Sequence, residues 1–125
     1  MQTPALVSIV IPCWNAEETI ARAISSALSQ TYPRTEIIVI DDGSTDGSLD
    51  AIRGFDKRIH WETQPNQGAC VARNRGLQIA SGDYVQFLDA DDELLPEKIA
   101  HQMALVQDAG PEVAFVAGAY IYRRV

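Results

Sequence analysis

The stretch that decides the fold of this chain is EIIVIDDGSTDG at residues 36–47, an apolar run that ends in an acidic, glycine-containing turn. The apolar part does not alternate with polar residues, which is typical of a strand covered on both faces in a parallel sheet. Two further runs, Val7–Ile11 and Tyr84–Leu88, have the same character and also lead into polar residues. Together the three runs predict the centre of a parallel β-sheet.

Segments with helical periodicity separate the strands. Between Ile20 and Leu28 apolar residues recur at spacings of three and four, and Asn15 followed by Glu18 resembles a capping box. This helix is expected to end near Gln30. Further helices are expected at Ser48–Arg53, at Ala69–Ala80 and from Pro96 to just before Gly110. The five expected strands are Val7–Ile11, Glu36–Ile40, Ile59–Thr63, Tyr84–Leu88 and Val113–Ala117. This alternation predicts an α/β domain with right-handed crossovers.

The composition indicates one acidic globular domain. A length of 125 residues suits a single core, and 10 Lys and Arg against 17 Asp and Glu give a net charge of −7. This excess argues against a nucleic acid or an anionic membrane surface as partner. No apolar run approaches the ~20 residues of a membrane-spanning helix, and no signal peptide is evident, so we expect a protein that is cytosolic or peripheral at the inner face of a membrane. We expect Cys13 and Cys70 to be reduced and buried.

The negative charge is concentrated after two of the strands. Nine of the 17 acids lie in two stretches, 41–50 and 89–97, each directly after an apolar run. Ligands of open α/β sheets bind beyond the carboxyl ends of the strands. We therefore expect both acidic stretches, together with the polar segment 12–15 after the first strand, to meet at one edge of the sheet.

Asp89 and Asp91 are candidate metal ligands. Two carboxylates two residues apart at a strand end can point toward one cation, and carboxylate oxygens suit Mg²⁺ or Mn²⁺. The repulsion between them also favours a divalent cation. Taken alone, an Asp-X-Asp tripeptide is more often a helix cap or a solvated turn.

Other residues at this edge are candidates for holding a nucleotide. Asp41 and Asp42 could accept hydrogen bonds from a base or a ribose, or form only a turn and an N-cap. Trp14 could stack on a base or serve only in packing. Gly68 opens a helix whose amides could attract phosphate. Arg73 or Arg75 could neutralise a diphosphate, or both could lie on a solvated helix face.

Several familiar protein classes fit this sequence poorly. The phosphate-binding loops of Rossmann dinucleotide-binding and P-loop proteins are both missing from it. Receiver domains match in length, acidity and alternation, but their paired acids follow the first strand and a lysine follows the last. Haloacid-dehalogenase phosphatases also place Asp-X-Asp after the first strand, whereas here it follows the fourth. A non-catalytic, receiver-like signalling or interaction module stays the alternative to an enzyme.

Five motifs occur in the order and spacing of one enzyme family. They are VSIVIPCWN at 7–15, SQTY at 29–32, EIIVIDDGSTDG at 36–47, NQG with ARN at 66–68 and 72–74, and GDYVQFLDADD at 82–92. Together they resemble the donor-binding half of family 2 glycosyltransferases with the GT-A fold, over almost the whole chain. The resemblance implies a Rossmann-like three-layer α/β/α domain with a mostly parallel sheet. It also favours functional roles for both acidic stretches.

The resemblance implies a role for each matching residue. Those that would bind the nucleotide sugar are Pro12, Trp14, Asp41, Asp42, Gly68, Arg73 and Asp89, with Trp14 in place of a more usual tyrosine. Asp42 would accept a hydrogen bond from the base, with Asp41 supporting the pocket. Asp91 would be the main ligand, together with Asp89, of a Mg²⁺ or Mn²⁺ ion that bridges the diphosphate and stabilises the leaving group.

The implied activity is transfer of a sugar, with inversion, from a nucleotide-diphospho-sugar to a hydroxyl acceptor. A UDP-sugar is the expected donor, and a glycan, a lipid-linked glycan or a protein is the expected acceptor. Enzymes of this kind continue well beyond this length and there supply the acceptor site and an acidic catalytic base. We therefore expect residues 1–125 to be one donor-binding domain, the N-terminal part of a longer enzyme, with the base beyond Val125.

Overall fold

The computed structural model describes residues 3–109, 115–116 and 121–123. These form one sheet in the strand order β3-β2-β1-β4-β6-β5. The strands are β1 (Val7–Cys13), β2 (Thr35–Asp41), β3 (His60–Thr63), β4 (Tyr84–Phe87), β5 (Phe115–Val116) and β6 (Ile121–Arg123). The helices are α1 (Ile20–Leu28), α2 (Ser48–Arg53), α3 (Ala69–Ile79) and α4 (Lys98–Ala109), with a short 3-10 helix, η1 (Asp56–Arg58). Strands β1 to β4 are parallel, whereas β6 is antiparallel to β4 and to β5.

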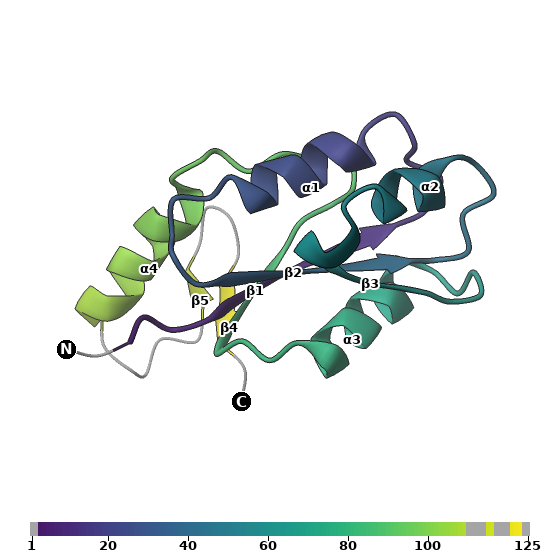
Figure 1. Ribbon diagram of the computed structural model, residues 1–125. Helices are drawn as coiled ribbons and strands as arrows, with labels where there is room; N and C mark the ends of the chain where they lie inside the picture. Colours follow the sequence, from purple (N-terminus) through teal and green to yellow (C-terminus); the bar gives the residue numbers. More distant parts are fainter. Residues whose placement is uncertain (1–2, 110–114, 117–120, 124–125) are drawn as a thin grey trace.

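Helices cover both faces of the sheet, with α1 and α2 on one side and α3 on the other (Figure 1). All seven residues of β1 are buried, and they divide between the two faces. Ile9 and Ile11 belong to the apolar cluster that includes α1 and α4, whereas Val10 packs in a second cluster with Ile38 and with Ala72 of α3. The expectation of a three-layer α/β/α domain is therefore confirmed.

Helix α1 forms where the apolar periodicity predicts it. Its buried residues are Ile20, Ala23, Ile24 and Ala27, which lie on one stripe because 3.6 residues make a turn. None of the described helices has the length and apolar composition needed to cross a lipid bilayer.

The structure differs from the sequence-based expectations near the end of the chain. Helix α4 begins at Lys98 rather than Pro96, and β6 has no counterpart among the expected strands. A three-residue strand is too short to show a periodic pattern, and β6 exists because it pairs with β4. Of the expected strand Val113–Ala117, the described part is Phe115–Val116, and its other residues lie outside the described ranges.

The expectation for the cysteines is half right. Both thiols are free, and Cys13 is buried in β1, but Cys70 is exposed on the first turn of α3. The sequence signal for burial was only that Cys is small and often fills core space.

Gly76 allows α3 to pack directly on β1. A Cβ atom at this position would lie 2.3 Å from Cγ1 of Val10, which is closer than two carbon atoms can approach without bonding. Contacts between α3 and β1 therefore depend on the missing side chain, and α3 carries Arg73 and begins beside Gly68.

We predict that Gly76→Ala lowers the free energy of unfolding by about 1–3 kcal/mol, because overpacking outweighs the gain in helix propensity. Urea denaturation followed by circular dichroism measures this, with the exposed Gln78→Ala in the same helix as control. Since the clash is with Val10, Gly76→Ala should be less destabilising in a Val10→Ala background. An equal loss in both backgrounds would contradict the assigned contact.

Candidate functional site

A pocket of about 720 Å³ lies at the carboxyl ends of β1, β2 and β4. The segments that lead into α1 and α3 complete its walls. Seven of the predicted site residues line it: Pro12, Trp14, Asp42, Gly68, Arg73, Asp89 and Asp91. The lining residues that were not assigned from the sequence are Cys13, Asn15, Ala16, Glu17, Glu18, Thr19, Asp46, Asn66, Ala69 and Ala90. The convergence of both acidic stretches on one edge of the sheet, expected because the strands were predicted to be parallel, is thus observed.

Asp42 is the best-connected polar residue of the pocket. Its side chain is almost completely buried, at 3% exposure. Oδ1 accepts hydrogen bonds from Gln64 Nε2 (2.9 Å) and the Gln67 amide (2.8 Å), and Oδ2 accepts them from Asn66 Nδ2 (3.1 Å) and the Gly68 amide (2.9 Å). A carboxylate offers about four acceptor sites, and here each has a protein donor. Asp42 therefore holds segment 64–68, one wall of the pocket, in place.

These hydrogen bonds control the ionisation of Asp42. Burial by itself raises its pKa, but the bonds from Gln64 and from the amides of Gln67 and Gly68 outweigh burial and leave the pKa below the ordinary value of 3.8. The carboxylate is thus charged at neutral pH, at the floor of a pocket that contains other acids.

Gly43 lets segment 64–68 approach Asp42. Its φ of 73° lies in the left-handed region, and a Cβ atom there would be 2.6 Å from the backbone nitrogen of Asn66. In the Asp42-Gly43 pair of the acidic turn, Asp42 therefore supplies the hydrogen-bond acceptors for segment 64–68, and Gly43 leaves space for the backbone of that segment.

Gly68 stands at the N-terminus of α3, where an anion could bind to free amides. Its own amide is already bonded to Asp42, so it is not free to bind a phosphate in this structure. A Cβ added at Gly68 would meet no atom within 4 Å, so a lack of space does not explain this glycine. Its φ of 101° is positive, a conformation that favours glycine.

Asp41 lies behind the pocket rather than in it. It is 2% exposed, and its Oδ2 accepts hydrogen bonds from Thr63 Oγ1 (3.1 Å) and from the Ser44 amide (3.4 Å). Within the described part of the chain its Oδ1 has no hydrogen-bond partner. Asp41 therefore ties the end of β2 to β3 and to the acidic turn. It does not line the pocket, and its role in supporting a bound nucleotide stays a prediction.

The segment after β1 is bound to the acidic turn after β2 by side chains from both sides. The Thr45 amide donates to Asn15 Oδ1 (2.8 Å), and the Gly47 amide donates to Glu17 Oε2 (2.9 Å). The predicted capping box is wrong, because Thr19 precedes α1 without a side-chain cap and Asn15 bonds to a segment 30 residues away. The local sequence does not show whether an Asn before a helix will cap that helix or bond to a distant loop.

Asp89 and Asp91 line one end of the pocket, and Asp92 lies next to them in the same acidic cluster, which is called the acidic end below. One carboxylate oxygen from each lies within 4.8 Å of the others, and all three residues are exposed. Hard oxygen donors in this number suit Mg²⁺ or Mn²⁺, which also keep water and ligand oxygens. The donor set therefore fits the cation expected from the sequence. Asp92 was not assigned as a ligand from the sequence, although it directly follows Asp91.

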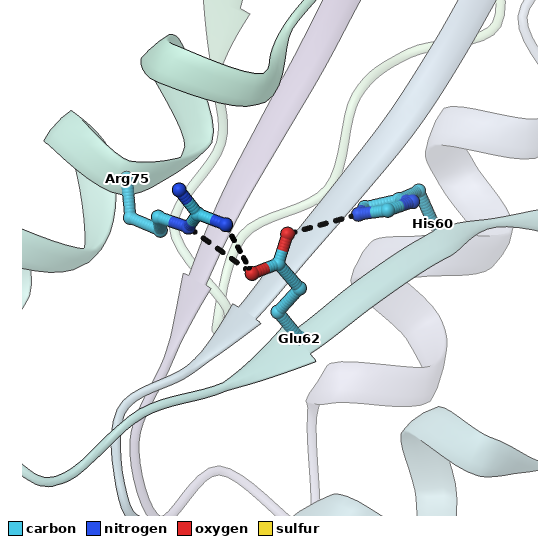
Figure 2. Close-up of polar contacts among 3 residues, drawn as sticks. All are labelled: His60, Glu62 and Arg75. Atoms are coloured by element: carbon cyan, nitrogen blue, oxygen red, sulfur yellow. Dashed lines mark hydrogen bonds and ion pairs between the residues drawn. The ribbon is translucent and has the colours of Figure 1, made fainter.

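Arg73 reaches this acidic end from α3. Its Nη2 lies 3.2 Å from Asp89 Oδ1. The next arginine on the helix, Arg75, points elsewhere: it bonds to Glu62 of β3 at 2.7 Å, and Glu62 also contacts His60 (Figure 2). Hydrogen bonds from Arg75 and His60 hold the pKa of Glu62 below its usual range. Of the two arginines, Arg73 alone lines the pocket.

Cys13 lies at the floor of the pocket as a neutral thiol. Burial raises its pKa to about 11, so the thiolate is not formed at neutral pH and the side chain is a poor nucleophile. Its position is a result of packing at the end of β1.

We predict that Asp42→Asn makes the free energy of unfolding less dependent on pH in the acid range. The depressed pKa means that the ionised form stabilises the fold above pH 3.8 and that this contribution is lost as pH falls through the folded-state value. The difference in unfolding free energy between the wild-type chain and the variant should be constant above about pH 5 and shrink below about pH 4.

Urea titrations across this pH range provide the measurement. At neutral pH, hydrogen exchange gives a second readout: the amides of Gln67 and Gly68 should exchange faster in Asp42→Asn, whereas that of Ala80, bonded to Gly76 at the other end of α3, should not. A difference in stability that stays the same down to about pH 3 would contradict this account of Asp42.

Comparison with known proteins agrees with this geometry. The family model described as Glycosyl transferase family 2 matches residues 8–124. The Escherichia coli protein named UDP-Glc:alpha-D-GlcNAc-diphosphoundecaprenol beta-1,3-glucosyltransferase WfaP is 44% identical over 104 residues, which are 82% of this chain and 41% of that protein. The chain spans less than half the length of the curated relatives it matches.

Two solved structures have the same fold. Staphylococcus aureus TarS 1-349 in complex with UDP superposes with a TM-score of 0.76 at 21% identity, over 94% of this chain and 46% of that one. The mannosyltransferase PcManGT from Pyrobaculum calidifontis, in complex with GDP-Man and Mn2+, gives a TM-score of 0.73 at 27% identity, over 90% of this chain and 35% of that one. With the family model matching nearly its whole length, this chain belongs to glycosyl transferase family 2, and its fold is the Rossmann-like α/β fold of GT-A enzymes.

Proposed function

We propose that this chain is the donor-binding part of an inverting, metal-dependent glycosyltransferase that uses a UDP-sugar. The observation that carries the proposal is the composition of one pocket, whose lining includes the exposed ring of Trp14, several carboxylates and the guanidinium of Arg73. The name of WfaP, a relative at 44% identity, specifies UDP-Glc as its donor, which supports the choice of nucleotide.

The base of the donor would lie against Trp14. This side chain is 56% exposed at the mouth of the pocket, which is unusual for a tryptophan and suits a ring that stacks on a planar ligand. Pro12 lies beside it in the same wall. Asp42 would accept a hydrogen bond from the base. Because its acceptor sites already have protein donors, one of these would have to leave, and we propose that it is the side-chain amide of Asn66, which lines the pocket.

The diphosphate would lie at the acidic end. Six acids line the described pocket, namely Glu17, Glu18, Asp42, Asp46, Asp89 and Asp91, and Arg73 is the one basic residue among the lining residues. A polyanion is repelled by such a pocket unless a cation is present. Asp91 and Asp89, with Asp92, would hold Mg²⁺ or Mn²⁺; when bound there, the cation supplies stabilisation of the charge on the departing nucleoside diphosphate. PcManGT, at 27% identity, is a complex with Mn2+, which supports this part of the proposal.

The chain's own residues would orient the donor. Trp14 and Asp42 would fix the nucleotide, Arg73 would contact the diphosphate, and Asp89 would lie near the ribose or the sugar. The acceptor would be a hydroxyl of a glycan, a lipid-linked glycan or a protein, and the catalytic base stays a prediction for sequence beyond Val125. We also propose action in the cytosol or at the inner face of a membrane, and the lipid-linked acceptor in the name of WfaP supports the latter.

Replacing Trp14 should weaken nucleotide binding. Stacking on an aromatic side chain contributes about 1–3 kcal/mol, so Trp14→Ala should raise the dissociation constant for UDP, measured calorimetrically with Mn²⁺ present, about fivefold or more. Trp14→Tyr should retain most of the affinity. Inorganic pyrophosphate has no base, so its binding should be unaffected, and an equal loss for pyrophosphate and UDP would argue against stacking.

Replacing Asp91 should abolish metal-dependent binding of the nucleotide without unfolding the chain. In the wild-type chain, UDP with Mg²⁺ should shift the amide resonances of Trp14, Asp42 and Asp91, and Asp91→Asn should remove these shifts while the far-ultraviolet circular dichroism spectrum stays unchanged. Asp50→Asn, which removes the same charge from an exposed position of α2 outside the pocket, serves as control. GDP tested alongside UDP checks the choice of base, and wild-type resonances unmoved by either nucleotide would refute the proposed function.

A further inference from the structure

The positively charged side chain of Arg73 forms an ion pair at the acidic end of the pocket. Its Nη2 lies 3.2 Å from Asp89 Oδ1, and the oxygens of Asp89, Asp91 and Asp92 lie within 4.8 Å of one another. Among the ion pairs of the described residues, this is the one that reaches any of the three acids. The guanidinium thus partly neutralises the cluster that the proposed metal would use.

The same guanidinium competes with a metal ion. A hydrogen bond to Arg73 occupies one of the lone pairs with which Asp89 could coordinate a cation, and two positive charges at neighbouring sites repel each other. Arg73 also lines the pocket, so a bound diphosphate would offer it a second set of anionic oxygens.

The geometry lets the Arg73 side chain change partner while its backbone stays in place. Helix α3 is packed on β1 through Gly76, and its N-terminus is held by the bonds from Gln67 and Gly68 to Asp42. By contrast, the side chains of Arg73 and Asp89 are 36% and 56% exposed. A long side chain at this exposure changes rotamer easily, because ion pairs in contact with water are weak.

We propose that Arg73 couples metal binding to nucleotide binding by exchanging partners. It pairs with Asp89 when the pocket is empty and with the diphosphate when the cation takes Asp89, so the metal alone binds weakly and the two ligands strengthen each other. This inference rests on the proposed function. By linkage, the factor by which UDP raises the affinity for Mn²⁺ equals the factor by which Mn²⁺ raises the affinity for UDP.

The test compares Arg73→Gln with Arg75→Gln. Both variants remove one positive charge from α3, but Arg75 bonds to Glu62, outside the pocket (Figure 2), so the second variant controls for net charge. Free Mn²⁺ is measured by electron paramagnetic resonance during titration of the 125-residue chain, and UDP binding is measured by calorimetry with and without Mn²⁺. Circular dichroism melts check that both variants are folded.

Arg73→Gln should bind Mn²⁺ alone about threefold to fivefold more tightly than Arg75→Gln, as expected when one exposed ion pair is removed. Its affinity for UDP in the presence of Mn²⁺ should fall. The factor by which each ligand raises the affinity for the other should therefore be smaller in Arg73→Gln than in the wild-type chain. Arg73→Lys, which keeps the charge, should bind Mn²⁺ alone as weakly as the wild-type chain.

Mn²⁺ binding by Arg73→Gln that is equal to or weaker than that of Arg75→Gln would overturn the exchange, because Arg73 would then be a fixed support that orients Asp89. If the wild-type chain bound UDP with Mn²⁺ in that same experiment, the proposed function would stand without the exchange. Failure of the wild-type chain to bind UDP with Mn²⁺ would overturn both.

Discussion

The burial of β1 on both faces and its pairing on both edges is the constraint on which the rest of the structure depends. Its seven residues are buried, β2 pairs along one edge and β4 along the other. This pairing places Cys13 opposite Asp41 and Val10 opposite Phe87. Because the three strands are parallel, the residues that follow them emerge at the same edge of the sheet, and the pocket forms there.

The pocket is shaped by polar side chains that bond across long sequence distances. Asp42 holds segment 64–68, and Asn15 and Glu17 hold the turn at 43–47. Each bond satisfies backbone amides that the loops would otherwise leave without partners, which matters near a buried floor. Two of these side chains, Asn15 and Asp42, lie within the sequence motifs described above, and in this structure both connect one loop to another.

The charge of the pocket gives the predicted metal requirement a physical basis. Asp89, Asp91 and Asp92 are close enough to repel one another, and Arg73 offsets part of this repulsion. An acidic pocket that receives an anionic donor must gain positive charge when the donor binds. In the exchange inferred for Arg73, the guanidinium leaves Asp89 when the cation binds there and pairs with the diphosphate instead.

Sequence alone determined the class of the domain and the edge at which its site lies, because both follow from local patterns. Unbroken apolar runs predict buried parallel strands, and the acids that follow them must then converge. Tertiary structure alone decided which partners the polar residues take. Asn15 bonds to Thr45 rather than capping α1 with Glu18, Asp42 is saturated by segment 64–68, and Arg73 but not Arg75 reaches the pocket. These partners lie 13 to 30 residues apart, so no local pattern encodes them. The short β6 likewise exists through its pairing with β4, which periodicity could not reveal.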